Sequence, residues 1–190
     1  MQHFETYLAL LEKWNRTINL VSPASLDDAW RRHVLDSAQL WRLCPPDARN
    51  WLDLGSGAGF PGLVVALLAR MAGAPLRVTL VESDERKCAF LRTVASTCAL
   101  DARIETGRIE DLPPALADVI SARALAPLDK LLGYAQIHRA ACGIGLFPKG
   151  RTVHKEVTEA RRNWRFDCQL HPSATDPDAA IVEVGALERV

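Results

Sequence analysis

The sequence has no excess of charge of either sign. Its 23 Lys and Arg residues balance 23 Asp and Glu residues, so the formal net charge is zero at pH 7. This balance argues against a protein that coats nucleic acid with a generally basic surface, and it directs attention to local basic patches instead.

Long apolar runs and export signals are also missing. The longest apolar run, residues 63–69, is far too short to span a bilayer. The N-terminus lacks the basic start and the small-residue cleavage site of a signal peptide. We therefore expect a soluble cytoplasmic protein with no membrane partner.

Cysteine is scarce and scattered, and no Cys-x-x-Cys pair occurs. The cysteines are Cys44, Cys88, Cys98, Cys142 and Cys168. An odd, scattered set is neither a disulfide framework nor a zinc site. We expect buried thiols in a reducing compartment and no bound metal.

What is present is the composition of one globular domain. Of the 190 residues, 48% are hydrophobic and 24% charged, which excludes intrinsic disorder, collagen and low-complexity polymers. The length fits one domain, at roughly 100–200 residues per domain.

Residues 1–46 are predicted to form an N-terminal helical extension, because apolar residues recur there at helical spacing. They are Phe4, Tyr7, Leu8, Leu11 and Trp14 in a first segment, and Leu26, Ala29, Trp30, Val34 and Trp41 in a second. The dipeptide Ser22-Pro23 separates the segments, and Ser25 is placed to cap the second helix.

Residues 47–190 are predicted to form a Rossmann-like domain, in one structural unit with the extension. Short apolar runs alternate with helical stretches, which is typical of βαβ units around a parallel sheet. The predicted strands are residues 50–54, 77–81, 102–105, 118–121 and 142–147, and the predicted helices are residues 61–71, 84–98 and 127–138. Strands at 166–170 and 180–184 have no helix between them, so we expect an antiparallel hairpin at the sheet edge. The fold class is therefore doubly wound α/β with an antiparallel last strand.

A glycine-rich turn follows the first predicted strand. Asp53 lies near the end of that strand, and Gly55, Gly57 and Gly59 precede the next helix. Glycines let a ligand approach the backbone, and the free N–H groups at a helix start favour an anion. Glu82, at the end of the next strand, is placed to accept hydrogen bonds from both hydroxyls of a ribose. The pattern predicts a ribose-bearing cofactor at the carboxyl edge of the sheet.

Two cofactors fit this turn. Residues 57–62 match G-x-G-x-x-G, so a dinucleotide, and with it a nicotinamide-dependent oxidoreductase, stays open as an alternative. Counted from Gly55, however, the sixth position is the bulky Phe60, where the helix must pack closely. S-adenosyl-L-methionine carries an amino acid in place of a pyrophosphate, so Asp53 can face its ammonium group while the turn amides face its carboxylate. The turn therefore favours S-adenosyl-L-methionine.

At this turn the sequence resembles a known family. LDLGSGAG at residues 52–59 resembles the first motif of class I S-adenosylmethionine-dependent methyltransferases. Further stretches narrow the resemblance to the RsmG (GidB, glucose-inhibited division protein B) family. They are WNRTINL at 14–20, RHVLDS at 32–37, GFPG at 59–62, ARALAPL at 122–128 and the pair Lys149-Gly150. The resemblance covers nearly the whole chain and implies an enzyme that methylates guanine N7 in a loop of bacterial 16S ribosomal RNA.

The chain departs from the family pattern in two places. It starts close to its first motif, so we expect it to lack an N-terminal helix usual in the family. In addition, Pro148 precedes Lys149 where a residue with a free N–H is more usual.

The resemblance also implies site residues. Cofactor contacts are implied for Gly55 and Phe60 at the turn, for Ile109 and Glu110 after the third strand, and for Arg123 after the fourth. Ile109 suits the adenine ring, with polar groups near the exocyclic amine. Arg123 is the implied catalytic residue, placed to orient donor and acceptor, and a structural ion-paired arginine is the alternative.

Guanine N7 has an in-plane lone pair and no proton at neutral pH. Methyl transfer to N7 therefore needs placement and desolvation but no general base. We accordingly predict no catalytic Cys, no metal and no essential His, with positive groups holding phosphate or guanine O6.

A local basic segment at residues 144–165 supplies the predicted RNA surface. Its basic residues are Lys149, Arg151, Lys155, Arg161, Arg162 and Arg165, against the acids Glu156 and Glu159. Such side chains can follow a phosphate backbone, although a solvated helix face explains the same charges. Lys149 and Arg151 are the predicted RNA contacts in this segment.

The resemblance adds Arg32 and Asp36 to the RNA site. These two residues are four apart on the second predicted helix and can pair, whereas His33 is expected to be a packed histidine. His138 is expected to lie in the core, and the tryptophans Trp14, Trp30 and Trp41 are expected to pack the helical extension onto the sheet.

The expected partner is 16S ribosomal RNA or the small ribosomal subunit, bound by a monomer. A second alternative is a non-catalytic RNA-binding module built on a decayed methyltransferase. The intact turn, Glu82 and Arg123 argue against such decay.

Overall fold

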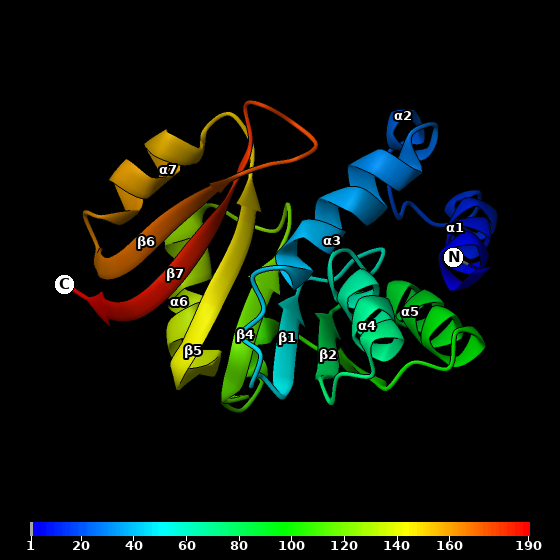
Figure 1. Ribbon diagram of the computed structural model, residues 1–190, viewed down its shortest axis with the longest axis horizontal. Helices are drawn as coiled ribbons and strands as arrows, with labels where there is room; N and C mark the ends of the chain where they lie inside the picture. Colours follow the sequence, from blue (N-terminus) through cyan, green and yellow to red (C-terminus); the bar gives the residue numbers. More distant parts are fainter. Residues whose placement is uncertain (1) are drawn as a thin grey trace.

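The computed structural model describes residues 2–190 and contains one seven-stranded sheet, with the strand order β3-β2-β1-β4-β5-β7-β6 (Figure 1). The strands are β1 (Asn50–Leu54), β2 (Arg77–Glu82), β3 (Ala102–Thr106), β4 (Ala117–Ala122), β5 (Arg139–Lys149), β6 (Trp164–Pro172) and β7 (Ala180–Arg189). The strands β3, β2, β1, β4 and β5 run parallel, and β7 pairs antiparallel with both β5 and β6. The predicted doubly wound α/β fold with an antiparallel last strand is confirmed, and β6 rather than β7 forms the edge.

Helices cover both faces of the sheet. They are α4 (Gly62–Ala72), α5 (Glu85–Thr97), α6 (Leu128–His138) and α7 (Val153–Ala160). Neighbouring residues of β1 divide between the two sides, since Trp51 packs in the core with α4 and α5 whereas Leu52 packs in the core with α6 and α7. Four consecutive residues of β1 are buried, as expected for a strand covered on both faces, and the bounds of β1 match those predicted.

The N-terminal extension is helical but less regular than its periodicity predicts. It contains α1 (Gln2–Asn15), α2 (Pro23–Leu26), a π-helix η1 (Trp30–Leu35) and α3 (Asp36–Trp41). The second predicted helix is thus broken into α2, η1 and α3. Ser25 lies inside α2 and donates to the carbonyl of Ser22, so the prediction that Ser25 caps a helix was wrong.

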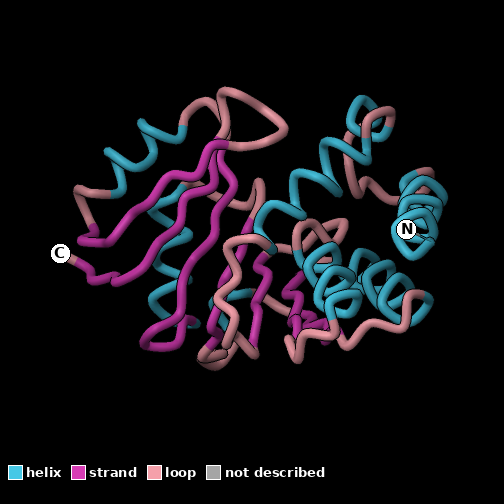
Figure 2. The backbone as a smooth tube through the Cα atoms, in the orientation of Figure 1, coloured by secondary structure: helices cyan, strands magenta, loops and turns pink. Residues whose placement is uncertain are grey.

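The extension shares the core of the sheet. Phe4, Tyr7 and Leu11 of α1 are buried in the same apolar cluster as α4 and α5. In Figure 2 the loop between β6 and β7 extends from the upper edge of the sheet toward the helices of the extension. Residues distant in sequence therefore meet at the carboxyl edge of the parallel strands.

The expected burial of the cysteines is confirmed only in part. Cys88 and Cys98 are buried as expected, but Cys142 is exposed. Across residues 2–190, no helix has the length and apolar character needed to cross a membrane.

The glycine turn after β1 depends on conformations that favour glycine. Gly55, Gly57 and Gly59 have φ angles of 62°, 54° and 92°, in the region that side-chain-bearing residues rarely adopt. A Cβ at Gly59 would lie 2.7 Å from the hydroxyl of Tyr7. That hydroxyl donates a buried 2.5 Å hydrogen bond to the carbonyl of Ala58. Helix α1 therefore supports the turn directly.

Asp53 is fully buried behind the turn. Its Oδ1 accepts a 2.6 Å hydrogen bond from the hydroxyl of Ser121, which itself accepts one from Nε1 of Trp51 at 2.8 Å. Burial raises the pKa of Asp53 to about 6. The carboxyl group thus links β1 to β4 in an environment that disfavours its charge.

We expect Tyr7→Phe to lower the free energy of unfolding by about 1–3 kcal/mol, because it leaves the buried Ala58 carbonyl without its donor. Urea unfolding measures this change. The matched control is Tyr134→Phe, since Tyr134 donates to the half-exposed Glu110 and water can replace that bond. An equal loss in both variants would contradict the supporting role of Tyr7.

We expect Asp53→Asn to change how stability depends on pH. The pKa of Asp53 rises from 3.8 to about 6 on folding, so its favourable contribution is complete below about pH 4 and is lost as the pH rises through about 6. In the wild type this loss lowers the free energy of unfolding by about 3 kcal/mol between about pH 4 and pH 7, at about 1.36 kcal/mol per pKa unit. Asparagine does not ionise, so this part of the fall should be absent from Asp53→Asn. Urea unfolding at several pH values, with the exposed Asp101→Asn as control, measures the difference. Identical pH profiles for wild type and Asp53→Asn would refute it.

Candidate active site

Two cavities adjoin at the carboxyl edge of the parallel strands. The first, here called the turn cavity, has a volume of about 430 Å³ and is lined by the glycine turn and the ends of β2 and β3. The second, here called the basic cavity after the Arg and Lys side chains in its lining, has a volume of about 980 Å³ and is lined by η1, α7 and the β6–β7 loop. Carboxylates in the lining balance these cations, with Asp28, Asp36, Glu156, Glu159 and Asp176 against Arg31, Arg32, Arg123, Lys149 and Lys155. Arg123, Ala124 and Leu125 line both cavities, so this segment forms the wall between them.

The turn cavity gathers most of the predicted cofactor residues. Those that line it are Gly55, Gly57, Phe60, Glu82, Ile109, Glu110 and Arg123. Asp53 and Gly59 are not among the lining residues, because Asp53 is buried behind the turn and Gly59 packs against Tyr7 and Leu63. The structure therefore shows a supporting position for Asp53 and Gly59, and it does not show the expected exposure of Asp53 to a ligand.

Glu82 ties the turn to the next strand. Its Oε2 accepts from the N–H of Gly57 at 2.9 Å, and its Oε1 accepts from the N–H groups of Ser83 and Asp84 at 2.8 and 2.9 Å. A carboxylate offers about four acceptor positions, so one remains for a ligand hydroxyl. The three hydrogen bonds from backbone N–H groups hold the carboxylate of Glu82 rigidly at the cavity wall.

The far end of the turn cavity combines an apolar residue with a polar cluster. Ile109, in the short helix η2 (Ile109–Asp111), is buried, and its carbonyl lies 3.1 Å from Nε2 of the buried His138. Glu110 accepts a 2.6 Å hydrogen bond from the hydroxyl of Tyr134, which lowers the pKa of Glu110. Lys130 lies 3.6 Å from the same carboxylate.

Sequence reasoning missed Tyr134 and Lys130, which line the turn cavity from α6. A signal was present, because these two residues stand four apart on the predicted helix and therefore share one face. The spacing alone does not place these residues in the site, because the sequence does not show that this face of the helix meets the segment after β3.

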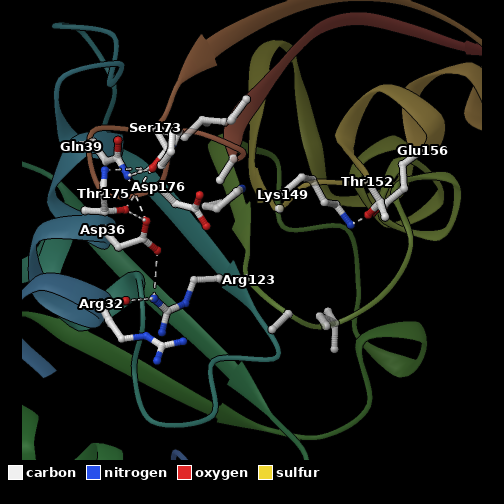
Figure 3. Close-up of a pocket in the computed structure, with 18 of the residues that line it drawn as sticks. Arg32, Asp36, Gln39, Arg123, Lys149, Thr152, Glu156, Ser173, Thr175 and Asp176 are labelled. Atoms are coloured by element: carbon white, nitrogen blue, oxygen red, sulfur yellow. Dashed lines mark hydrogen bonds and ion pairs between the residues drawn. The ribbon is translucent and has the colours of Figure 1, made fainter. Parts of the chain in front are cut away.

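Arg123 is the centre of a hydrogen-bonded and stacked cluster. Its Nη1 donates to Oδ2 of Asp36 and to the carbonyl of Arg32, both at 3.1 Å (Figure 3). Its Nη2 lies 2.9 Å from Nδ1 of His33. Because a guanidinium only donates, Nδ1 of His33 accepts. The guanidinium carbon also lies 5.2 Å from the ring centroid of Phe60, in cation–π range.

His33 is packed, as expected. Its ring stacks on Phe60 with the centroids 4.8 Å apart, and it is 8% exposed. Burial, together with the charge of Arg123, lowers the pKa of His33 to about 4. The imidazole is therefore neutral at pH 7 and serves as an acceptor for Arg123.

The π-helix η1 makes the contact between Arg32 and Arg123 possible. In the widened turn the N–H of Asp36 donates to the carbonyls of Arg31 and His33, and the carbonyl of Arg32 accepts from Arg123 instead. Such π-turns occur frequently at functional sites. The predicted pair of Arg32 with Asp36 does not form, because Asp36 pairs with Arg123; the side chain of Arg32 lines the basic cavity.

The β6–β7 loop is bound to the extension across the basic cavity (Figure 3). Thr175 donates from Oγ1 to Oδ1 of Asp36 at 2.8 Å, and Gln39 donates from Nε2 to the hydroxyl of Ser173 at 3.2 Å. Nη2 of Arg31 donates to the carbonyl of Thr175 at 2.9 Å. Asp36 therefore receives Thr175 on one oxygen and Arg123 on the other.

The remaining predicted RNA residues have different environments. Lys149 lines the basic cavity, but its ammonium lies 2.8 Å from Oε2 of Glu156 and donates to the carbonyl of Ala126 at 2.7 Å. Arg151 is exposed and is not among the residues that line either cavity. Within the described part of the chain no cluster of His, Cys, Asp and Glu has the form of a metal site.

Comparison with known proteins agrees with this geometry. A family model described as rRNA small subunit methyltransferase G matches residues 1–177. The ribosomal RNA small subunit methyltransferase G of Ruegeria sp. is 47% identical over 190 residues, which cover 100% of this chain and 92% of the relative. The protein of the same name from Cereibacter sphaeroides is 50% identical over 184 residues, which cover 97% of this chain and 89% of the relative.

Solved structures share the fold at low sequence identity. A SAM dependent methyltransferase from Aquifex aeolicus has a TM-score of 0.62 at 16% identity, covering 86% of this chain and 95% of that one. M. jannaschii TYW2 in complex with AdoMet has a TM-score of 0.61 at 12% identity, covering 92% and 80%. The family match sets aside the nicotinamide-dependent oxidoreductase. The chain belongs to the rRNA small subunit methyltransferase G family of S-adenosyl-L-methionine-dependent enzymes, and the resemblance in its sequence motifs is thereby confirmed.

Proposed function

We propose that the protein transfers the methyl group of S-adenosyl-L-methionine to N7 of a guanine in a loop of 16S ribosomal RNA. The observation that supports this proposal most is the meeting of the turn cavity and the basic cavity at residues 123–125. One cavity is then available to the donor and the other to the base. When bound, the donor supplies an electrophilic methyl group on a sulfonium centre.

The residues of the turn cavity fit the donor. An added Cβ at Gly57 would have only the carbonyl of Gly55 nearby, at 3.9 Å, so the turn borders open space. The volume of about 430 Å³ lies in the usual range for small-ligand sites. Glu82 would hold a ribose hydroxyl, Ile109 would pack on the adenine, and Glu110 with Tyr134 would lie near its polar edge.

The basic cavity suits an acceptor that has no proton to lose. Guanine N7 attacks with its own lone pair, so the protein has to orient the base and exclude water. The carboxylates of Asp36 and Glu156 are engaged by Arg123 and Lys149. These ion pairs hold the cavity walls, and the base becomes cationic only after transfer.

We further infer that an RNA loop binds over the basic cavity to a monomer in the cytoplasm. The exposed residues Arg32 and Lys155 line the cavity, and Arg151 lies beside it. These three side chains can neutralise phosphates around one splayed nucleotide. We accordingly propose Arg32, Arg151 and Lys155 as phosphate contacts and Arg123 with Asp36 as the inner wall of the acceptor site.

Direct mapping of the methylated atom tests the proposal. Small-subunit ribosomal RNA is incubated with the protein and tritium-labelled donor, then cleaved with borohydride and aniline, which cut at N7-methylguanine, and mapped by reverse transcription. We expect label at one guanine that disappears from RNA already methylated there. Label at another atom would refute the N7 assignment, and RNA binding without label would favour the non-catalytic module.

We expect Arg123→Ala to lower methyl transfer by about 100-fold or more, because misplacing the wall between donor and base by about 1 Å has effects of this size. The free energy of unfolding should fall by about 3–5 kcal/mol, because Asp36 loses the cation of a largely buried ion pair. Turnover and urea unfolding are measured on the same samples. Arg16→Ala, which removes an exposed pair with Glu12, is the control for both. Wild-type turnover in Arg123→Ala would leave Arg123 a purely structural arginine.

A further inference from the structure

We propose that Lys149 and Glu156 are positioning residues that clamp the wall between the two cavities, and that Lys149 does not bind RNA phosphate. The proposal rests on the proposed function, because the reaction positioned is the methyl transfer described above. It reverses the prediction made for Lys149 from the sequence.

The clamp is a set of short contacts between three elements (Figure 3). Nζ of Lys149, at the end of β5, lies 2.8 Å from Oε2 of Glu156 on α7. The same ammonium donates to the carbonyl of Ala126 at 2.7 Å, and the same carboxylate oxygen accepts from the N–H of Leu128 at 2.9 Å. Thr152 donates to the other oxygen of Glu156 at 3.0 Å. The ion pair therefore holds the chain on both sides of Pro127, directly after the wall at residues 123–125.

The wall needs to be held, because its conformation is unfavourable by itself. Ala124 has a φ angle of 54°, in the left-handed region that alanine rarely adopts. Such a conformation persists only where the surrounding structure imposes it. Asp36 holds the segment at Arg123, and the clamp holds it at Ala126 and Leu128.

Lys149 is poorly placed to contact phosphate. Its side chain is only 10% exposed, and two of its three N–H donors are occupied by Glu156 and Ala126. Moving the ammonium toward RNA would leave the carboxylate of Glu156, only 19% exposed, without its cation. Removing one partner of a buried ion pair is strongly unfavourable.

Lys155 offers a matched comparison on the same cavity. Its side chain is 75% exposed and lies 3.8 Å from Glu159 in a loose pair. The two lysines thus differ in environment and share the same charge and chain length. A phosphate contact is expected of Lys155, and a positioning effect is expected of Lys149.

Kinetics of Lys149→Met and Lys155→Met separate the two roles. For Lys149→Met we expect kcat to fall about 10- to 100-fold with the KM for RNA within about 2-fold of wild type. For Lys155→Met we expect KM to rise and the slope of log binding constant against log salt to shrink by about 1. If Lys149→Met shows the pattern expected of Lys155→Met, the clamp is refuted.

Glu156→Gln provides an independent variant. As a clamp partner it should lower kcat as Lys149→Met does, and the double variant should be no slower than the slower single variant, because the two residues act as one unit. If Lys149 instead binds phosphate, Glu156→Gln should strengthen RNA binding and leave kcat unchanged. Fully additive losses in the double variant would likewise count against the clamp.

Amide hydrogen exchange tests the clamp without any substrate. Residues 124–128, and the amide of Leu128 above all, should exchange at least about 10-fold faster in Lys149→Met and Glu156→Gln, while β1 keeps its protection. Unchanged exchange in this segment would overturn the proposal. This measurement decides the clamp even if the wild-type protein fails to methylate guanine, in which case the proposed function alone is refuted.

Discussion

The backbone of the turn after β1 is the constraint on which the rest of the site depends. Three glycines with positive φ angles turn the chain away from the strand, and only residues without a Cβ fit beside Tyr7 and Leu125. Glu82 holds the N–H of Gly57, and Tyr7 holds the carbonyl of Ala58. The turn is therefore fixed from the next strand and from the N-terminal helix at once. This explains why the extension packs into the core of the sheet and is integral to the site.

Much of the fold was predictable because its signals are local. The central strands of the sheet contain short apolar runs, the edge strands β3 and β6 mix apolar with polar residues, and the bounds predicted for β1 match the structure. The second helix of the extension was predicted as continuous, because the spacing of its apolar residues does not reveal a π-turn. That turn accompanies a tertiary contact, the hydrogen bond from Arg123 to the carbonyl of Arg32. A pattern of side chains carries no information about which carbonyl a distant guanidinium will use.

The sequence predicts many of the residues that line the candidate site, but it does not predict which residues they contact. The turn, Glu82, Ile109, Glu110 and Arg123 all line one cavity, since the carboxyl ends of parallel strands lie along one edge. Their partners come from elements that sequence spacing cannot bring together. Asp36 pairs with Arg123 across 87 residues, although Arg32 stands four positions away, and Lys149 turns inward to Glu156 rather than outward to solvent.

These pairings change what the basic segment contributes. The cationic residues at the basic cavity fall into two groups that differ in their partners. Arg123 and Lys149 are engaged by carboxylates inside the protein, whereas Arg32, Arg151 and Lys155 remain exposed. A few phosphate contacts give modest, salt-sensitive affinity and no sequence discrimination. Under the proposed function, selection of one guanine comes from the fit of a single base between the wall at residues 123–125 and the β6–β7 loop, so we expect the rigidity of that wall to matter more than total positive charge.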